Sequence, residues 1–113
     1  MMFPAGSGLA TMINLKPNFL KKVKGILAGH VPECDVLVYG SRAGAAAKAH
    51  SYLDLAVMAE IPLTASRLEK LSAAFHKAGF PFRVETVDWA ATGKDYRKVI
   101  KKTGVLIQTS PKK

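Results

Sequence analysis

Apolar residues recur at helical spacing in three segments of this chain. The first segment begins at Pro17, a residue favoured in the first turn of a helix, and its pattern stops at Gly29. The second begins with the capping-box sequence Ser66-x-x-Glu69. The third covers residues 95–102 and is followed by a glycine. We therefore predict three amphipathic helices.

Short apolar runs between these helices predict strands. The runs cover residues 35–39, 52–58 and 82–87, with a short terminal stretch at 105–108. An alanine-rich stretch at 42–48 is predicted to form a short helical linker between the first two strands. In the last predicted helix, Tyr96, Val99 and Ile100 are expected to face inward. This alternation of helices and strands predicts an α/β (α+β) fold.

Length and composition indicate a single domain. The chain has 113 residues, of which 49% are hydrophobic, and this is enough for one modest core. We predict a flexible leader at 1–12, the folded domain at 13–108 and a basic tail at 109–113. The leader has no basic stretch followed by a long apolar run, so neither a signal peptide nor a membrane span is expected. The lone Cys34 is expected to be a buried residue, which suits the reducing cytoplasm.

The formal net charge of +9 indicates an acidic partner. Basic residues gather at 21–24, at 94–102 and in the tail. In the helices they lie opposite the apolar stripes, so solvent-exposed helix faces are the default interpretation. The alternatives are an electrostatic funnel for ATP or RNA, or a patch that fits an acidic protein. Aromatic residues do not alternate with these charges as a base-stacking platform requires, which disfavours nucleic acid as a direct partner.

The candidate chemistry begins directly after the first predicted strand, with Gly40, Ser41 and Arg42. Glycine lets a backbone approach a phosphate closely, and serine adds a small hydrogen-bond donor. Arg42 is the basic residue best placed to meet phosphates. A Gly-Ser pair by itself is more often an ordinary turn, so the interpretation depends on the residues of the next predicted strands.

The second predicted strand carries a carboxylate, Asp54, between two leucines. Because strand residues alternate between the two faces, His50, Tyr52 and Asp54 are expected to project to one side. An ionised carboxylate in an apolar strand needs a partner or a metal ion. The alternative to a metal is an ion pair with Arg42 or Arg83.

Three runs occur together in a recognisable order: 36–42, 51–57 and 83–90. In order and spacing they resemble the minimal nucleotidyltransferase family of the nucleotidyltransferase superfamily, and the resemblance extends from about Asn14 to Gln108. It implies a nucleotidyltransferase fold, in which a small mixed β-sheet is flanked by helices. It also implies ATP and Mg²⁺ as cofactors.

The resemblance assigns roles to particular residues. It implies that Asp54 and Glu85 are catalytic and metal-binding, and that Gly40, Ser41 and Arg42 bind the cofactor. In the family two aspartates hold the divalent ions in the second run, whereas here Tyr52 replaces the first. A tyrosine hydroxyl, with a pKa near 10, is a poor magnesium ligand.

Two further acidic side chains have alternative interpretations. Glu85 stands where the family usually has a third aspartate, and it would act as the base for the incoming hydroxyl or as a ligand to a second metal. The alternative is a solvated glutamate on an edge strand. Asp88 is expected to end its strand and to face the side opposite Glu85.

The resemblance also implies a partner. Minimal nucleotidyltransferases are typically encoded beside a small helical HEPN-type toxin, which they bind as antitoxins and in some cases modify by transferring AMP from ATP to a tyrosine. Our leading hypothesis is an antitoxin of this kind whose transfer activity is weakened or lost through Tyr52. The alternatives are a fully active transferase, a catalytically inactive partner-binding protein and a basic nucleic-acid-binding domain.

Overall fold

The computed structural model of the chain describes residues 13–44 and 47–110. In chain order its elements are α2 (Pro17–His30), β1 (Asp35–Tyr39), η1 (Gly40–Ala43), β2 (Leu53–Met58), α3 (Ala65–Lys77), β3 (Val84–Asp88), η2 (Trp89–Ala91), α4 (Lys94–Thr103) and β4 (Val105–Gln108), where η marks a short 3₁₀ helix. The predicted leader at 1–12 and the last three residues of the predicted tail lie outside the described residues.

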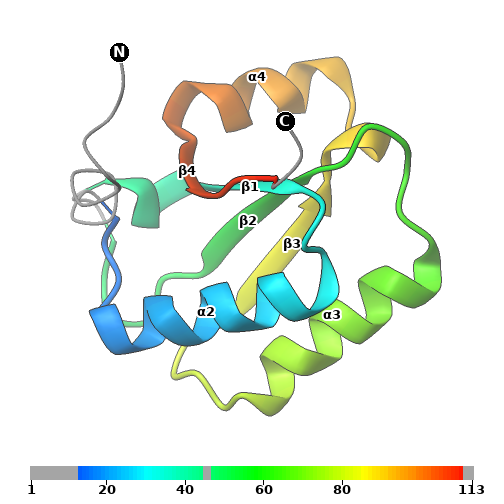
Figure 1. The fold of residues 1–113 in the computed structure, drawn as a ribbon. Helices are drawn as coiled ribbons and strands as arrows, with labels where there is room; N and C mark the ends of the chain where they lie inside the picture. The colour runs from blue at the N-terminus through cyan, green and yellow to red at the C-terminus, as the bar shows by residue number, and fades with distance from the viewer. Residues whose placement is uncertain (1–12, 45–46, 111–113) are drawn as a thin grey trace.

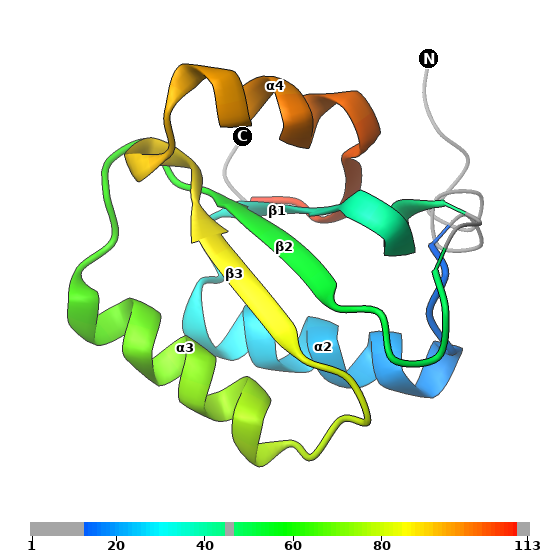
Figure 2. The same cartoon turned by 180° about the vertical axis from the view of Figure 1, so that it is seen from behind.

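The four strands form one mixed sheet in the order β3-β2-β1-β4. Strand β1 is antiparallel to both β2 and β4, whereas β2 and β3 run parallel. Helices α2 and α3 lie on one face of the sheet and α4 lies on the other, as Figure 1 and the view from behind in Figure 2 show. This arrangement confirms the predicted fold class, a single domain in which a small mixed sheet is flanked by helices.

The main hydrophobic core fills the space between the sheet and helices α2 and α3. Its completely buried side chains are Val23, Leu27, Val31, Val36, Val38, Leu53, Leu55, Val57 and Leu71. A smaller cluster lies under α4 and comprises Tyr39, Ala56 and Ile100. Since strand residues alternate, the residues between the core positions of β2 face α4, and Asp54 is one of them.

Several predicted segments agree well with the elements of the structure. Helix α2 begins at Pro17 as predicted and continues one residue past Gly29. Strand β1 covers the predicted residues 35–39, and β4 covers the predicted 105–108. Cys34 is buried, as expected, and is a free thiol.

The predicted capping box of the second helix is wrong. Helix α3 begins at Ala65, and its N-cap is Thr64, whose Oγ1 accepts a hydrogen bond from the Arg67 backbone N–H at 3.1 Å. The residue before the cap is fixed as well, because the Leu63 N–H donates to the Asp88 carboxylate at 2.7 Å. This contact starts the helix early and leaves Ser66 inside its first turn.

The helical linker predicted at 42–48 is also wrong where the structure describes it. Only the 3₁₀ helix η1 forms, and Gly44 follows it in an extended conformation. The Arg42 side chain donates hydrogen bonds to the backbone carbonyls of Lys48, Ala49 and Ser51. These side-chain hydrogen bonds therefore override the helix propensity of the alanines.

Helix α4 differs from its prediction in the side chains that it buries. It has the expected position, but Ile100 is its only buried residue, while Tyr96 and Val99 are 45% and 50% exposed. The helix thus covers only part of the sheet face on which it lies. This face, to which Asp54 points, is covered by fewer buried apolar side chains than the face that packs against α2 and α3.

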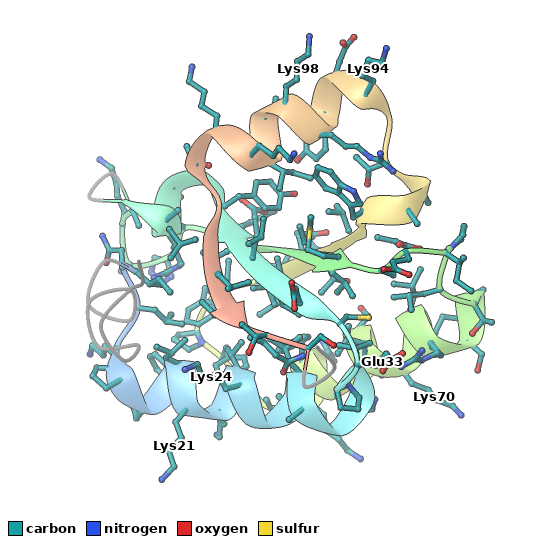
Figure 3. The ribbon with its side chains drawn as sticks, turned by 45° about the horizontal axis from the view of Figure 1, so that its top comes forward. Lys21, Lys24, Glu33, Lys70, Lys94 and Lys98 are labelled. Carbon is teal, nitrogen blue, oxygen red and sulfur yellow. The ribbon has the colours of Figure 1, made fainter. Side chains whose placement is uncertain are left out.

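The positive charge is spread over both outer layers of the molecule. In Figure 3, Lys94 and Lys98 extend from α4, while Lys21 extends from α2 on the opposite side. Among the described residues these lysines do not share one face, so they do not form the continuous basic surface that favours nucleic acid. None of the described helices is both long and apolar enough to cross a membrane.

Candidate active site

Two acidic side chains lie side by side on neighbouring strands. Asp54 of β2 pairs in register with Glu85 of the parallel strand β3, and on its other side with Tyr39 of β1. Paired residues in adjacent strands point to the same face, and the strands are separated by about 4.8 Å. Tyr39, Asp54 and Glu85 therefore form a row across the sheet, on the face that α4 partly covers. The strand pairing thus brings together the two carboxylates that the sequence selected.

Asp54 is an uncompensated carboxylate. Burial, followed by the negative charge of Glu85, raises its pKa above the usual value for aspartate. Within the described residues its carboxylate makes no ion pair and no hydrogen bond, so the predicted alternative of an ion pair with Arg42 or Arg83 is not formed. A cation placed between Asp54 and Glu85 would remove their repulsion.

The turn after β1 is packed directly against Asp54. Gly40 has φ +78°, and a Cβ atom at this position would lie 2.7 Å from Asp54 Oδ2. Both the backbone conformation and the close approach require glycine. The Gly40 N–H donates to Thr103 Oγ1 at 3.0 Å, so this amide is not free for a phosphate as the sequence suggested. The Ser41 hydroxyl makes no hydrogen bond within the described part of the chain.

Arg42 lies inside the protein instead of at the turn surface. It is 5% exposed, and its guanidinium is 4.5 Å from the centre of the Phe82 ring. Besides the three carbonyls of the 48–51 loop, it donates to the Asn14 carbonyl at 2.8 Å. These contacts occupy the side chain, and burial lowers its pKa. The phosphate-binding role expected for Arg42 does not fit this placement; the residue holds the loop that leads into β2.

Tyr52 lies just before β2 begins, and its ring contacts Arg83. It is 50% exposed, and its ring centre lies 5.8 Å from the Arg83 guanidinium. Arg83 Nε in turn forms an ion pair with Glu85 Oε2 at 2.9 Å. Glu85 is on an edge strand with its side chain 46% exposed, as in the alternative interpretation of this residue. Nothing in this arrangement replaces the missing carboxylate.

Two other predicted side chains lie away from the carboxylates. His50 precedes the strand, so the predicted alternation does not extend to it, and its Nδ1 is 3.4 Å from the Pro81 carbonyl oxygen. Asp88 is buried, and its carboxylate accepts hydrogen bonds from the Leu63 and Ala90 N–H groups. It ends β3 and faces away from Glu85, which confirms the role predicted for it.

Tyr39 and Thr103 contact the site without having been selected from the sequence. The Tyr39 hydroxyl lies 3.0 Å from that of Tyr96. Burial chiefly raises the Tyr39 pKa, with contributions from the Tyr96 hydrogen bond and from the charges of Asp54 and Glu85, so the phenol stays protonated. The Tyr39–Asp54 pairing could have been found from strand register; the Thr103 contact has no sequence signal.

The donor set suits magnesium. Mg²⁺ is usually held by one or two carboxylates together with substrate phosphates, and Asp54 and Glu85 supply two. Among the described residues no group of three or more His, Cys, Asp or Glu side chains gathers into a metal site. A metal here would therefore need the nucleotide to complete its ligands, since Tyr52 contributes no carboxylate.

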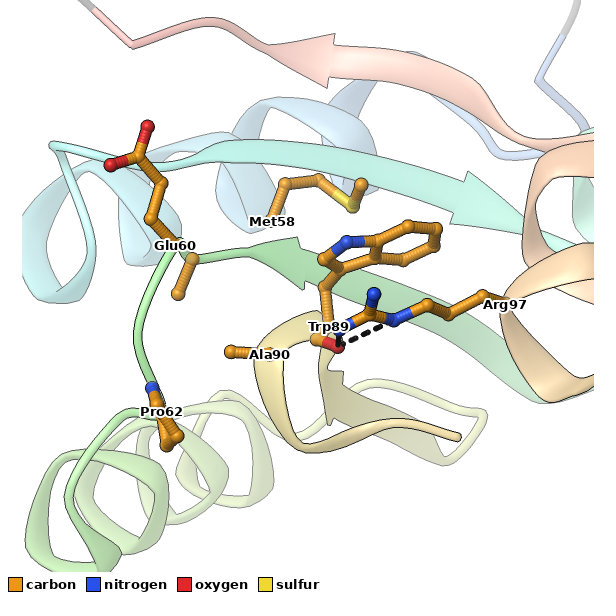
Figure 4. Close-up of a pocket in the computed structure, with 7 residues that line it drawn as sticks. Met58, Glu60, Pro62, Trp89, Ala90 and Arg97 are labelled. Atoms are coloured by element: carbon orange, nitrogen blue, oxygen red, sulfur yellow. Dashed lines mark hydrogen bonds between the residues drawn. The ribbon is translucent and has the colours of Figure 1, made fainter. Parts of the chain in front are cut away.

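Two pockets lie elsewhere on the molecule. One of about 360 Å³ lies beside Trp89, whose ring is 4.6 Å from the Arg97 guanidinium (Figure 4). A groove of about 900 Å³ borders Cys34 and Ile61. Neither is lined by Asp54 or Glu85, so both hollows are separate from the carboxylate row.

Comparison with known proteins identifies a relative that is similar in sequence over most of the chain. A protein of Haemophilus influenzae described as "Probable protein adenylyltransferase MntA" is 40% identical over 100 residues, which span 88% of this chain and 88% of that protein. No family model matches the chain.

Solved structures show the same fold at lower identity. A chain of a toxin-antitoxin complex with AMP-PNP has a TM-score of 0.70 at 18% identity, with 81% of this chain and 74% of that chain covered. A chain of the complex between tri-AMPylated Shewanella oneidensis HEPN toxin and MNT antitoxin has a TM-score of 0.64 at 17% identity, with 80% and 70% covered.

Proposed function

Because this chain belongs to the minimal nucleotidyltransferase family, we propose that it is the antitoxin of a HEPN-type toxin and transfers AMP from ATP to that toxin. The related protein is described as an adenylyltransferase, and structures of the same fold contain an ATP analogue or an AMPylated toxin. We further propose that Tyr52 makes the transfer slow.

The observation that carries this proposal is the pair formed by Asp54 and Glu85 beside the Gly40 turn. The two carboxylates are in register on adjacent strands, and Gly40 leaves no room for a side chain against Asp54. A raised pKa caused by burial and a like charge is typical of functional sites. A purely structural aspartate at this position would be expected to have a partner.

The chemistry assigns a task to each of these groups. At the turn after β1 the Ser41 hydroxyl, which has no hydrogen bond within the described residues, would donate to a phosphate of ATP, while the Gly40 N–H stays bonded to Thr103 Oγ1. The oxygen of the acceptor hydroxyl bonds to the α-phosphorus, the bond to pyrophosphate breaks, and pyrophosphate leaves with the bonding electrons. The acceptor proton passes to Glu85, which must first release Arg83; because this ion pair is exposed, its cost is small. Asp54 would hold Mg²⁺ together with the phosphates of ATP, and the ion would neutralise charge on the reacting phosphates, which leaves the Glu85 carboxylate free to accept the proton.

The test uses the HEPN-type toxin proposed as the partner of this chain. The two proteins are incubated with ATP and Mg²⁺, and AMP attached to the toxin is measured by mass spectrometry over time. We expect slow transfer by the wild-type chain and none by Asp54→Ala. Tyr52→Asp, which restores a carboxylate at an exposed position, should raise the rate on the order of a hundredfold. Transfer that survives in Asp54→Ala would contradict the assignment.

A second candidate, an antitoxin that binds without catalysis, is favoured by one observation. Arg83 already neutralises Glu85, so the carboxylate that the reaction needs has a protein partner. In that case only Tyr52→Asp transfers AMP, while the wild-type chain still binds the toxin. If neither form binds the toxin, both candidates fail.

A further inference from the structure

Helix α4 holds the β1–η1 junction at two consecutive residues. At Tyr39 the contact is the hydroxyl of Tyr96, 3.0 Å away, with the two rings packed edge to face. At Gly40 it is Thr103 Oγ1, which accepts the backbone N–H at 3.0 Å. Tyr96 and Thr103, which lie two turns apart on α4, thus contact the adjacent residues Tyr39 and Gly40.

This junction is the part of the backbone closest to the uncompensated carboxylate. Tyr39 is the strand partner of Asp54, and the α-carbon of Gly40 faces Asp54 Oδ2 with no room for a methyl group. A small shift of the junction would therefore change both the position of the turn and the space available to the carboxylate.

Thr103 is itself held in place by its neighbours. The following residue, Gly104, packs so closely that a Cβ atom there would lie 2.8 Å from the Ile100 carbonyl oxygen and 2.9 Å from Leu37 Cδ1. Ile100 is completely buried, and β4 continues from Gly104 as a strand paired with β1. An exposed threonine at a helix end is usually free to change rotamer, but here the backbone is fixed and Oγ1 accepts the Gly40 N–H at 3.0 Å.

We propose that Thr103 is a positioning residue of the nucleotide site, which sets the Gly40 turn against Asp54 without touching the substrate. The proposal rests on the nucleotide binding proposed above. A net hydrogen bond contributes about 0.5–1.5 kcal/mol, so its loss is expected to weaken nucleotide binding about two- to tenfold.

The test compares two substitutions at Thr103 with one elsewhere. Thr103→Val keeps the shape and removes the acceptor oxygen, whereas Thr103→Ser keeps the oxygen. Thr109→Val makes the same chemical change at an exposed threonine past the end of β4. Affinity for AMP-PNP with Mg²⁺ is measured by calorimetry, and hydrogen exchange at the Gly40 amide is followed by NMR. All variants are measured well below their unfolding midpoints, so that a loss of stability alone does not change the affinity.

We expect Thr103→Val to bind two- to tenfold more weakly, with faster exchange at Gly40, and Thr103→Ser to restore both values. Thr109→Val should match the wild type. If the wild type binds and Thr103→Val binds equally well, the inference fails and the proposed function stands. If the wild type does not bind, the series is repeated with Tyr52→Asp; absence of binding in that background as well overturns the proposed ATP site and the inference together.

Discussion

At the scale of one residue, Gly40 determines both the backbone conformation of the turn and the space that is left for the Asp54 carboxylate. Its φ of +78° is a conformation that L residues adopt only with strain, and its α-carbon lies against Asp54. Gly79 offers an independent measure of the strain alone, because it has φ +72° with nothing within 4 Å of a Cβ atom.

These two glycines allow a matched comparison. Gly40→Ala should lower the free energy of unfolding by more than Gly79→Ala, which should cost about 1 kcal/mol from backbone strain. Gly40→Ala should also abolish binding of AMP-PNP with Mg²⁺, since the added methyl group displaces the Asp54 carboxylate, while Gly79→Ala should bind normally. Urea unfolding and calorimetry measure the two effects. Equal stability losses with binding retained in both variants would show that Gly40 does not position Asp54.

At the scale of elements, the hydrophobic pattern predicted most of the fold and the strand register supplied much of the site. The helical periodicity located α2 correctly, because its apolar stripe follows directly after Pro17. The two predicted strands that carry Asp54 and Glu85 are neighbours in the sheet, and their register pairs the two carboxylates. The failures came from side-chain hydrogen bonds, which the apolar pattern does not record. Arg42 donates to the carbonyls of the 48–51 loop, six to nine residues further along the chain, and Asp88 accepts the Leu63 N–H from 25 residues away.

The helix α3 cap gives a test at the same scale, since two candidate residues lie two positions apart. Thr64→Ala should lower the free energy of unfolding by about 1 kcal/mol, because the Arg67 N–H loses its acceptor. Ser66→Ala should have little effect or stabilise slightly, because Ser66 is inside the helix, where alanine is the better residue. Urea unfolding of both variants decides between the two caps. A larger loss for Ser66→Ala would restore the capping box predicted from the sequence.

At the scale of the whole molecule, two carboxylates act on stability in opposite directions. Glu33 forms a hydrogen-bonded ion pair with Arg67, and this contact lowers the Glu33 pKa. Asp54 has no such partner among the described residues, and its pKa is raised. A group with a lowered pKa stabilises the fold above its unfolded-state pKa, whereas an acid with a raised pKa destabilises the fold once it ionises. The other interactions of the fold therefore offset the free-energy cost of the ionised, partly buried Asp54 carboxylate, as functional sites commonly require.

This opposition predicts the pH dependence of two charge-neutralising variants. Asp54→Asn should unfold at a higher temperature than the wild type at pH 7, because it removes a desolvated charge beside Glu85. That advantage should shrink as the pH falls through the raised pKa of Asp54, where the folded wild type takes up a proton. Glu33→Gln should instead be less stable at pH 7, and its deficit should shrink as the pH falls through the lowered Glu33 pKa. Thermal unfolding from pH 7 to pH 3, without Mg²⁺ or nucleotide, measures both. If Asp54→Asn were destabilised at pH 7 in the manner of Glu33→Gln, Asp54 would have a stabilising partner in solution, and the site would lose the uncompensated charge on which its affinity for a cation depends.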